Sequence, residues 1–285
     1  MYVGVNGTRL FFDVEGPLLV PDGAAMRARP TLVLVHGGPG GYDHSYFKPH
    51  FSRLATDIQL VYLDLRDHGR SQRHDPADWS YQTCADDLRA FLDAIGIIRP
   101  VVLGHSLGGF VALLSGARHP GHAAGLILQS TTAWFTIDRV VAGFRRIAGE
   151  EVAELARLDF GGQPVTDEQS ERVAAAFGPR VPDRDTLARR IGNPDLALRS
   201  TELLLGFDAR DQLAGIDVPT LVAVGELDPV TPTEAAREIL DGLPAGIGRL
   251  DVLPGAGHFP WLDRPDAYFD SVRQFVARTA GPGAA

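Results

Sequence analysis

Three residues that lie far apart in the chain have the types and the order needed to make a serine hydroxyl reactive: Ser106, Asp228 and His258. A serine hydroxyl is a poor nucleophile at neutral pH, so it needs a neighbouring base to take its proton. An imidazole serves as that base when a carboxylate holds it in one tautomer. Together such residues would attack the carbonyl carbon of an ester or an amide, and we predict this chemistry for the chain.

The sequence around Ser106 is the pentapeptide 104–108, Gly-His-Ser-Leu-Gly. It follows an aliphatic run at 101–103 that predicts a strand, and it precedes a stretch at 109–117 that predicts a helix. A G-x-S-x-G sequence arises by chance in glycine-rich chains, but a strand before it and a helix after it are the context in which it positions a nucleophile. The glycines lack a Cβ and allow a sharp turn, so we expect a strained backbone at the serine.

The base and its carboxylate are found by their place in the chain. Eight of the nine histidines lie at or before His122, and only His258 follows, at the end of a glycine-rich loop after a predicted strand. The carboxylate is expected between serine and histidine, directly after a strand. Asp228 meets this condition, with Glu226 as the second choice. The competing interpretation is that Asp228 only begins a turn, as Asp-Pro sequences often do.

A second glycine-rich loop, residues 36–41 (His-Gly-Gly-Pro-Gly-Gly), follows an apolar run at 31–35. Such glycine density after a buried strand indicates that the backbone must approach something closely. Neither of the phosphate-binding glycine patterns is present. We predict that the N–H of Gly38, or else that of Gly37, joins the N–H of Leu107 in an oxyanion hole. A turn with a purely structural role is the alternative.

The elements that must position these residues alternate between buried strands and helices. Continuous apolar runs are typical of strands covered on both faces of a parallel sheet. An antiparallel hairpin over 2–15, with Asn-Gly at its turn, opens the chain. Residues 17–30 are rich in Pro, Gly and Ala and predict a loop. We expect an α/β fold with a mostly parallel eight-stranded sheet and helices on both faces.

The pattern changes after residue 131. Residues 132–212 contain no strand-like run but several amphipathic helical segments, which prolines separate. Thr166 and Gln169 have the spacing of a capping box for one of these helices. We therefore predict a core formed by 1–131 and 213–285, with 132–212 inserted as a helical cap, or lid.

Composition bounds the partners and the location. The chain has 285 residues, a formal net charge of −9 and one cysteine, Cys84. The negative charge argues against nucleic acid or an anionic membrane as a partner. A single cysteine excludes an internal disulfide, and Cys84 is expected to be a small core residue. We find no signal peptide and no membrane span, so a cytoplasmic location is expected. Residues 280–285 suggest a frayed tail.

The order of glycine-rich loop, G-x-S-x-G, helical insertion, Asp and His resembles the α/β-hydrolase superfamily across nearly the whole chain. Within it, residues 36–40, His-Gly-Gly-Pro-Gly, are similar to the signature of the proline iminopeptidase branch. The resemblance implies a serine hydrolase with a helical cap, no metal and no organic cofactor. It also implies a small-molecule or short-peptide substrate, such as a peptide with an N-terminal proline.

Two positions depart from that branch. Leu107 stands where tryptophan usually follows the nucleophile, and Asp67 stands where a glycine is expected in the segment 64–71. The branch also binds the free amino group of its substrate with acidic residues of the cap. The acidic residues of the cap considered for that role are Glu150, Glu151, Glu154 and Glu202, although helix faces exposed to solvent explain most of them equally well.

Other functions remain open at this point. A carboxylesterase or lactonase would use the same three residues on a substrate that has no amino group. A ligand-binding protein could keep the fold as a pocket without catalysis. Epoxide and haloalkane hydrolases of this fold are disfavoured, because they have an aspartate where Ser106 stands.

Overall fold

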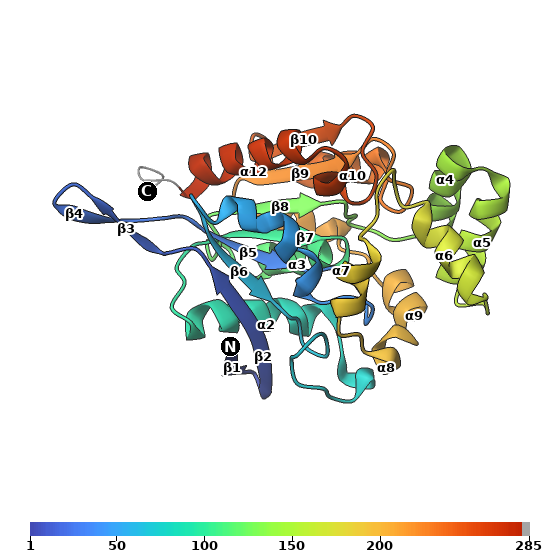
Figure 1. The fold of residues 1–285 in the computed structure, drawn as a ribbon, viewed down its shortest axis with the longest axis horizontal. Helices are drawn as coiled ribbons and strands as arrows, with labels where there is room; N and C mark the ends of the chain where they lie inside the picture. The colour runs from blue at the N-terminus through green and yellow to red at the C-terminus, as the bar shows by residue number, and fades with distance from the viewer. Residues whose placement is uncertain (281–285) are drawn as a thin grey trace.

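A computed structural model describes residues 1–280 of the chain, whose centre is an eight-stranded sheet with the order β1-β2-β6-β5-β7-β8-β9-β10 (Figure 1). β1 and β2 form an antiparallel hairpin, and β2 pairs antiparallel with β6, while all other neighbours are parallel. The expected mostly parallel eight-stranded sheet is therefore confirmed. Its strands are β1 (Tyr2–Val5), β2 (Thr8–Glu15), β5 (Thr31–Val35), β6 (Gln59–Leu63), β7 (Val101–His105), β8 (Gly125–Gln129), β9 (Thr220–Gly225) and β10 (Gly248–Leu253).

Helices cover both faces of this sheet because its central strands are apolar on both sides. In β5, Val33 and Val35 belong to one hydrophobic core, whereas Leu32 and Leu34 belong to the other. Figure 1 shows α2 and α12 on opposite sides of the sheet. The first core is covered by α2 (Tyr81–Ala94), α3 (Leu107–Arg118) and α10 (Thr233–Gly242), and the second by α1 (Lys48–Phe51) and α12 (Pro265–Ala280). Cys84 is buried on α2, as expected.

The two hairpins near the N-terminus show where sequence patterns succeed and fail. The turn between β1 and β2 is Asn6-Gly7, and both residues have positive φ (44° and 72°), as a tight hairpin turn requires. The predicted loop at 17–30 was wrong, because it contains a second hairpin of β3 (Leu19–Asp22) and β4 (Ala25–Ala28). Its side chains are mostly exposed, so no burial pattern marks these strands in the sequence.

The segment between β8 and β9 is helical, as predicted, and its capping box at Thr166 and Gln169 is formed. We call residues 132–212 the cap. Figure 1 shows α4, α5 and α6 together beyond one end of the sheet. The cap helices are α4 (Ile137–Ala148), α5 (Glu150–Phe160), α6 (Asp167–Ala175), α7 (Arg184–Arg189), α8 (Pro194–Ala197) and α9 (Ser200–Leu205). The remaining short helices are η1 (His44–Tyr46), η2 (Ser52–Leu54), η3 (Pro76–Asp78), η4 (Arg210–Gly215) and α11 (Pro260–Asp263).

Backbone hydrogen bonds fasten the cap to the loops at the carboxyl ends of the strands. The N–H of Asn193 donates to the carbonyl of Gly40 (2.7 Å), and the N–H of His258 donates to the carbonyl of Phe177 (2.7 Å). The cap is therefore attached both to the first glycine-rich loop and to the loop that holds His258. Across residues 1–280, none of the helices has the length and apolar character needed to cross a membrane. Most of the expected frayed tail, 281–285, lies outside the described residues.

Candidate active site

Ser106 lies in the turn between β7 and α3, with the strained backbone that was predicted. Its φ is 54° and its ψ is −121°, a conformation that L-residues rarely adopt. The neighbouring glycines make the turn possible. A Cβ on Gly104 would lie 2.1 Å from the carbonyl oxygen of Gly108, and one on Gly108 would lie 2.2 Å from that of Val35. The turn holds Ser106 at the carboxyl end of the sheet, partly exposed.

His258 and Asp228 form a buried pair. His258 Nδ1 lies 2.9 Å from Asp228 Oδ2, which also accepts the hydroxyl of Thr231 (2.8 Å). Asp228 Oδ1 accepts the N–H groups of Val230 (2.9 Å) and Thr231 (3.0 Å). Because an ionised carboxylate only accepts, the proton of the imidazole is on Nδ1, and Nε2 is left as an acceptor. This is the tautomer that a general base requires.

Ser106 and His258 both line a cavity of about 580 Å³. Within residues 1–280, the described hydrogen bonds include none between the Ser106 hydroxyl and the imidazole. Asp228 does not itself line the cavity, but three residues hydrogen-bonded to it, Val230, Thr231 and His258, do. Glu226, the second choice for the carboxylate, instead accepts the N–H of Gly255 (2.9 Å) in an exposed turn, so it plays no part in this arrangement.

The first glycine-rich loop borders the same cavity. A Cβ on Gly37 would lie 3.3 Å from the Cβ of Ser106, which shows how closely the loop approaches this serine. The N–H of Gly37 donates to the Tyr46 hydroxyl (3.0 Å), whereas the N–H of Gly38 has no acceptor within residues 1–280. Leu107 is the first residue of α3, so its N–H has no acceptor within the helix.

Buried hydrogen bonds of His105, the residue before Ser106, connect this loop to His258. His105 Nε2 lies 3.1 Å from the backbone oxygen of His258, and a carbonyl only accepts, so Nε2 carries the proton. His105 Nδ1 therefore accepts the Tyr46 hydroxyl (2.7 Å), and Tyr46 Oη is left to accept the N–H of Gly37. Burial holds the pKa of His105 well below its ordinary value, so the ring is neutral at pH 7 and these directions are fixed.

His68 supports the loop from the other side. Its Nε2 accepts the N–H of Gly40 (2.9 Å), and its Nδ1 lies 2.9 Å from the carbonyl oxygen of Arg66. Complete burial is the main reason that the pKa of His68 falls to about 3. Because the His68 ring is neutral and both of its nitrogens form hydrogen bonds to backbone, its role is to support the loop.

Asp67, one of the two departures from the expected branch, has a local explanation. Its φ is 65°, in the left-handed region that favours glycine. Aspartate tolerates this region better than most residues, because its short polar side chain bonds to nearby backbone. Here Asp67 Oδ1 accepts the N–H of His74 (2.5 Å). The turn is therefore kept although the glycine is replaced.

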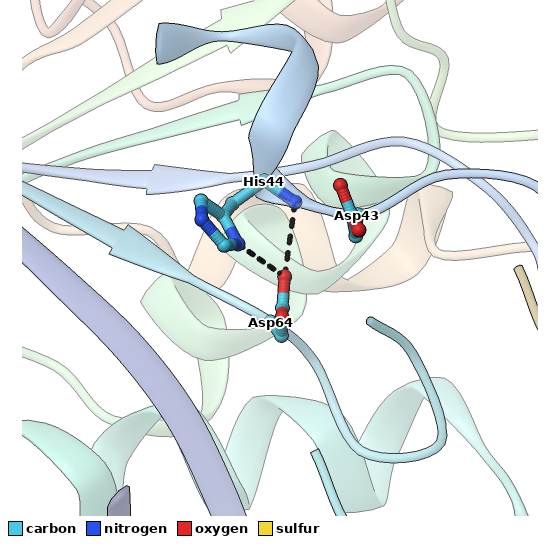
Figure 2. Close-up of side chains that lie close together, drawn as sticks. All are labelled: Asp43, His44 and Asp64. Atoms are coloured by element: carbon cyan, nitrogen blue, oxygen red, sulfur yellow. Dashed lines mark hydrogen bonds and ion pairs between the residues drawn. The ribbon is translucent and has the colours of Figure 1, made fainter. Parts of the chain in front are cut away.

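Asp43, His44 and Asp64 form a buried cluster whose ligand atoms lie within 4.8 Å of one another (Figure 2). Asp64 Oδ1 accepts both the backbone N–H of His44 (2.9 Å) and its Nδ1–H (2.6 Å), and Oδ2 accepts the N–H of Arg70 (2.9 Å). Burial alone would raise the pKa of Asp64, but the hydrogen bond and charge of His44, together with His36 and the N–H of Arg70, hold it below its ordinary value.

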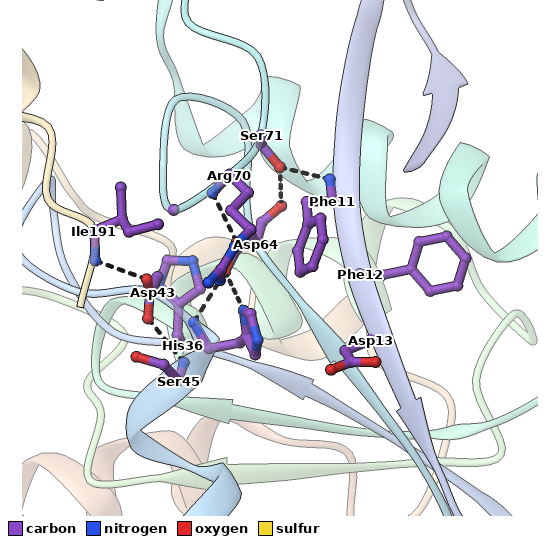
Figure 3. Close-up of polar contacts among 12 residues, drawn as sticks. Phe11, Phe12, Asp13, His36, Asp43, Ser45, Asp64, Arg70, Ser71 and Ile191 are labelled. Carbon is purple, nitrogen blue, oxygen red and sulfur yellow. Dashed lines mark hydrogen bonds and ion pairs between the residues drawn. The ribbon is translucent and has the colours of Figure 1, made fainter. Parts of the chain in front are cut away.

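Asp43 completes this cluster by joining two segments. One carboxylate oxygen accepts the N–H of Ser45 (2.8 Å) and caps η1, while the other accepts the N–H of Ile191 in the cap (2.8 Å) (Figure 3). Each carboxylate oxygen of Asp43 and Asp64 thus already has an N–H donor. The cluster serves as a structural junction between the loops and the cap.

The cap side of the cavity carries charges that have no ion-pair partner within the described residues. Asp159 at the end of α5 is half-buried, and burial raises its pKa. Asp167 and Glu171 on α6 and Arg190 after α7 also line the cavity. The sequence reasoning missed these four residues. Their only signal is a place on amphipathic helices, which does not separate a face toward the cavity from a face toward solvent.

The glutamates considered for the amino group lie elsewhere. None of them lines the cavity, and each forms an ion pair with an arginine on an exposed surface: Glu150 with Arg145, Glu151 with Arg172, Glu154 with Arg157 and Glu202 with Arg199. The structure therefore does not bring these glutamates to the cavity, and they form exposed helix faces, as the sequence analysis suggested for most of them.

Comparisons with known proteins place the chain in a family of hydrolases. The family described as "alpha/beta hydrolase fold" matches residues 30–265. A pimeloyl-[acyl-carrier protein] methyl ester esterase of Neisseria meningitidis is 29% identical over 86% of this chain and 92% of its own length. A proline iminopeptidase of Lactiplantibacillus plantarum is 29% identical over 95% and 98%. The crystal structure of an enol-lactonase from Burkholderia xenovorans matches with a TM-score of 0.69 and 25% identity, over 97% and 99%.

Proposed function

The chain belongs to the α/β hydrolase fold family, and from that premise we propose that it is a serine hydrolase that releases an N-terminal residue, proline or another small one, from a short peptide. Ser106 is the nucleophile, His258 the general base and Asp228 the residue that orients it. The cap, residues 132–212, closes the cavity and sets specificity. The single observation that carries the proposal is the Asp228–His258 hydrogen bond beside the cavity that Ser106 also lines.

The reaction has two steps. As Ser106 Oγ bonds to the carbonyl carbon, its proton passes to His258 Nε2, the nitrogen that Asp228 leaves free. The C–N bond then breaks, and His258 gives the proton to the departing amine. Water repeats the sequence on the acyl-enzyme: it loses a proton to His258, attacks the ester carbon and expels Ser106, which regains its proton. The charge of the imidazolium is balanced in each step by Asp228.

The oxyanion formed in each step is held by two backbone N–H groups. Leu107 provides one at the start of α3, where the helix dipole also favours negative charge. Gly38 provides the other, because its N–H has no acceptor within residues 1–280. The N–H of Gly37 already donates to the Tyr46 hydroxyl, so Gly37 has no part in the oxyanion hole.

The peptidase activity is supported by the charge of the cavity. Asp159, Asp167 and Glu171 would bind the free ammonium group of the substrate, a role for which the branch with the His-Gly-Gly-Pro-Gly signature uses acidic residues of its cap. Aromatic side chains beside them, including Phe160 and Phe177, offer an apolar surface for a proline ring. A match to a proline iminopeptidase over 95% of the chain supports the same substrate class.

A fluorophosphonate probe tests the nucleophile. We expect covalent labelling of the native protein and none of the Ser106→Ala variant, and labelling that persists in the variant would disprove the assignment. Prolyl-naphthylamide and p-nitrophenyl acetate then test the substrate class. Turnover of the ester alone would reject the peptidase.

The second candidate is an esterase or lactonase. The likeness to a methyl ester esterase and to an enol-lactonase favours it. An uncharged ester gains nothing from three carboxylates in the cavity, so this candidate predicts that neutralising Asp159 leaves turnover of the true substrate unchanged. The peptidase predicts a loss.

A further inference from the structure

The cavity is lined by a positive side chain as well as by negative ones. Arg190 is the only lysine or arginine among the described residues that line it, whereas α5 and α6 contribute three carboxylates. Helix α7, which Arg190 directly follows, packs against η1, whereas α6 packs against α5. The positive and negative side chains therefore come from different parts of the cap.

Arg190 is held in place by its neighbours in the chain. The N–H of Ile191 donates to the buried Asp43 carboxylate (2.8 Å), and the N–H of Asn193 donates to the carbonyl of Gly40 (2.7 Å). The guanidinium lies 5.3 Å from the centre of the Tyr42 ring. It forms no ion pair or hydrogen bond with residues 1–280, so its N–H donors remain available to a ligand.

The position of Arg190 relates it to the oxyanion loop. Tyr42 packs against Tyr46 (ring centres 5.3 Å apart), and the Tyr46 hydroxyl accepts the N–H of Gly37. Arg190 thus packs on Tyr42, the residue that directly follows this loop, and it lines the same cavity as Ser106. A guanidinium is suited to bind a carboxylate, since its N–H groups match both carboxylate oxygens.

We propose that Arg190 binds the terminal carboxylate of the substrate, so that the substrate is a short peptide with both a free amino group and a free carboxylate. This inference rests on the proposed function, which places the ammonium group at Asp159, Asp167 and Glu171. The carboxylate at the other end then belongs to the departing peptide. A cavity of about 580 Å³ is the size expected for such a small ligand.

Binding measured without turnover tests the inference. In a Ser106→Ala background, calorimetry compares prolyl-alanine with prolyl-alanine amide, which differ only in the carboxylate. We expect prolyl-alanine to bind about tenfold tighter or more than its amide, because only the carboxylate offers the guanidinium a charged acceptor. Arg190→Gln should abolish this preference, and Arg190→Lys should keep part of it.

Arg184→Gln is the matched control, because Arg184 is the first residue of α7, the helix that Arg190 follows, and it is exposed and does not line the cavity. In this variant prolyl-alanine should still bind more tightly than its amide. Equal binding of acid and amide, or a preference that survives Arg190→Gln, would overturn the inference.

Hydrolysis by the native protein separates this inference from the proposed function. If Arg190 selects the acid but no proline is released from prolyl-alanine, the peptidase assignment fails and the carboxylate site stands. If proline is released and the acid has no advantage, the site at Arg190 fails and the peptidase stands.

Discussion

The two sides of the cavity are built in different ways. The floor, which we define as Gly37, Tyr46, His105, Asp228 and His258, consists of buried groups whose hydrogen bonds have fixed directions. The roof, defined as Asp159, Asp167, Glu171 and Arg190, consists of partly or fully exposed charges without partners in residues 1–280. A rigid floor suits a reaction whose geometry does not vary, and unpaired charges in the roof suit the recognition of a charged substrate.

The largest effect is expected at the floor, from Asp228→Asn. An amide that turns its NH₂ group toward His258 Nδ1 favours the other tautomer, whose Nε2 carries a proton and takes none from Ser106. We expect kcat to fall by about 10⁴ with little change in KM.

Steady-state kinetics on prolyl-naphthylamide measure this loss. Glu226→Gln is the control, since Glu226 is an acid in the same loop whose carboxylate accepts a hydrogen bond from the backbone N–H of Gly255. Its kcat should stay within about twofold of the native value. A fall in kcat of similar size in both variants would show that Asp228 does not act on His258 in a way that Glu226 does not.

A smaller effect is expected from Tyr46→Phe, also in the floor. Removing the hydroxyl leaves the N–H of Gly37 and Nδ1 of His105 without a partner, and each unpaired buried group costs about 1–3 kcal/mol of stability. Because Gly38 follows Gly37, a shift of Gly37 should also move the N–H of Gly38 relative to the oxyanion. We expect kcat to fall by roughly tenfold at an unchanged KM.

Tyr62→Phe is the control for this prediction. Tyr62 is buried and its hydroxyl bonds to Glu15 (2.9 Å), away from the cavity. Denaturant unfolding should show a loss of stability in both variants, whereas kcat should fall only for Tyr46→Phe. Equal kcat values for the two variants would mean that Tyr46 contributes to the stability of the fold and not to catalysis.

The same division explains what could be predicted from the sequence. The turn at Ser106 and the loop with Asp228 follow the buried strands β7 and β9, and the loop with His258 follows the edge strand β10. Parallel strands bring their carboxyl ends to one edge. Local patterns therefore predicted that Ser106, Asp228 and His258 lie at the same edge of the sheet. They did not reveal that the Tyr46 hydroxyl accepts a hydrogen bond from the N–H of Gly37, because the side chains that contact a loop depend on tertiary packing.

The roof escaped prediction for a related reason. Glu154 and Asp159 lie on the same helix, α5, and both read as polar positions, yet only Asp159 faces the cavity. Which polar face meets the cavity depends on how α5 packs against its neighbours. Arg190 is placed by a contact between Ile191 and Asp43, 148 positions apart in the chain. No periodic pattern marks such a contact.

The smallest effect is expected at the roof, where either the substitution Asp159→Asn or a fall in pH removes the charge of Asp159. Burial raises the pKa of Asp159, so its carboxylate takes up a proton at a higher pH than an ordinary aspartate does. As pH falls through that raised pKa, the negative charge is lost and the ammonium group binds more weakly. We expect KM for prolyl-naphthylamide to rise a few-fold, by about 3–10, with kcat nearly unchanged, because the group is only half-buried and solvent screens it.

Profiles of KM against pH measure this effect and show what causes it. Asp159→Asn should have the raised KM at all pH values and lose this part of the pH dependence, and p-nitrophenyl acetate, which has no amino group, should not respond to the substitution. Glu154→Gln, which removes a charge from an exposed ion pair on the same helix, should keep the native profile. If Glu154→Gln changed the profile as much as Asp159→Asn does, the general charge of the cap, and not a site in the roof, would attract the substrate.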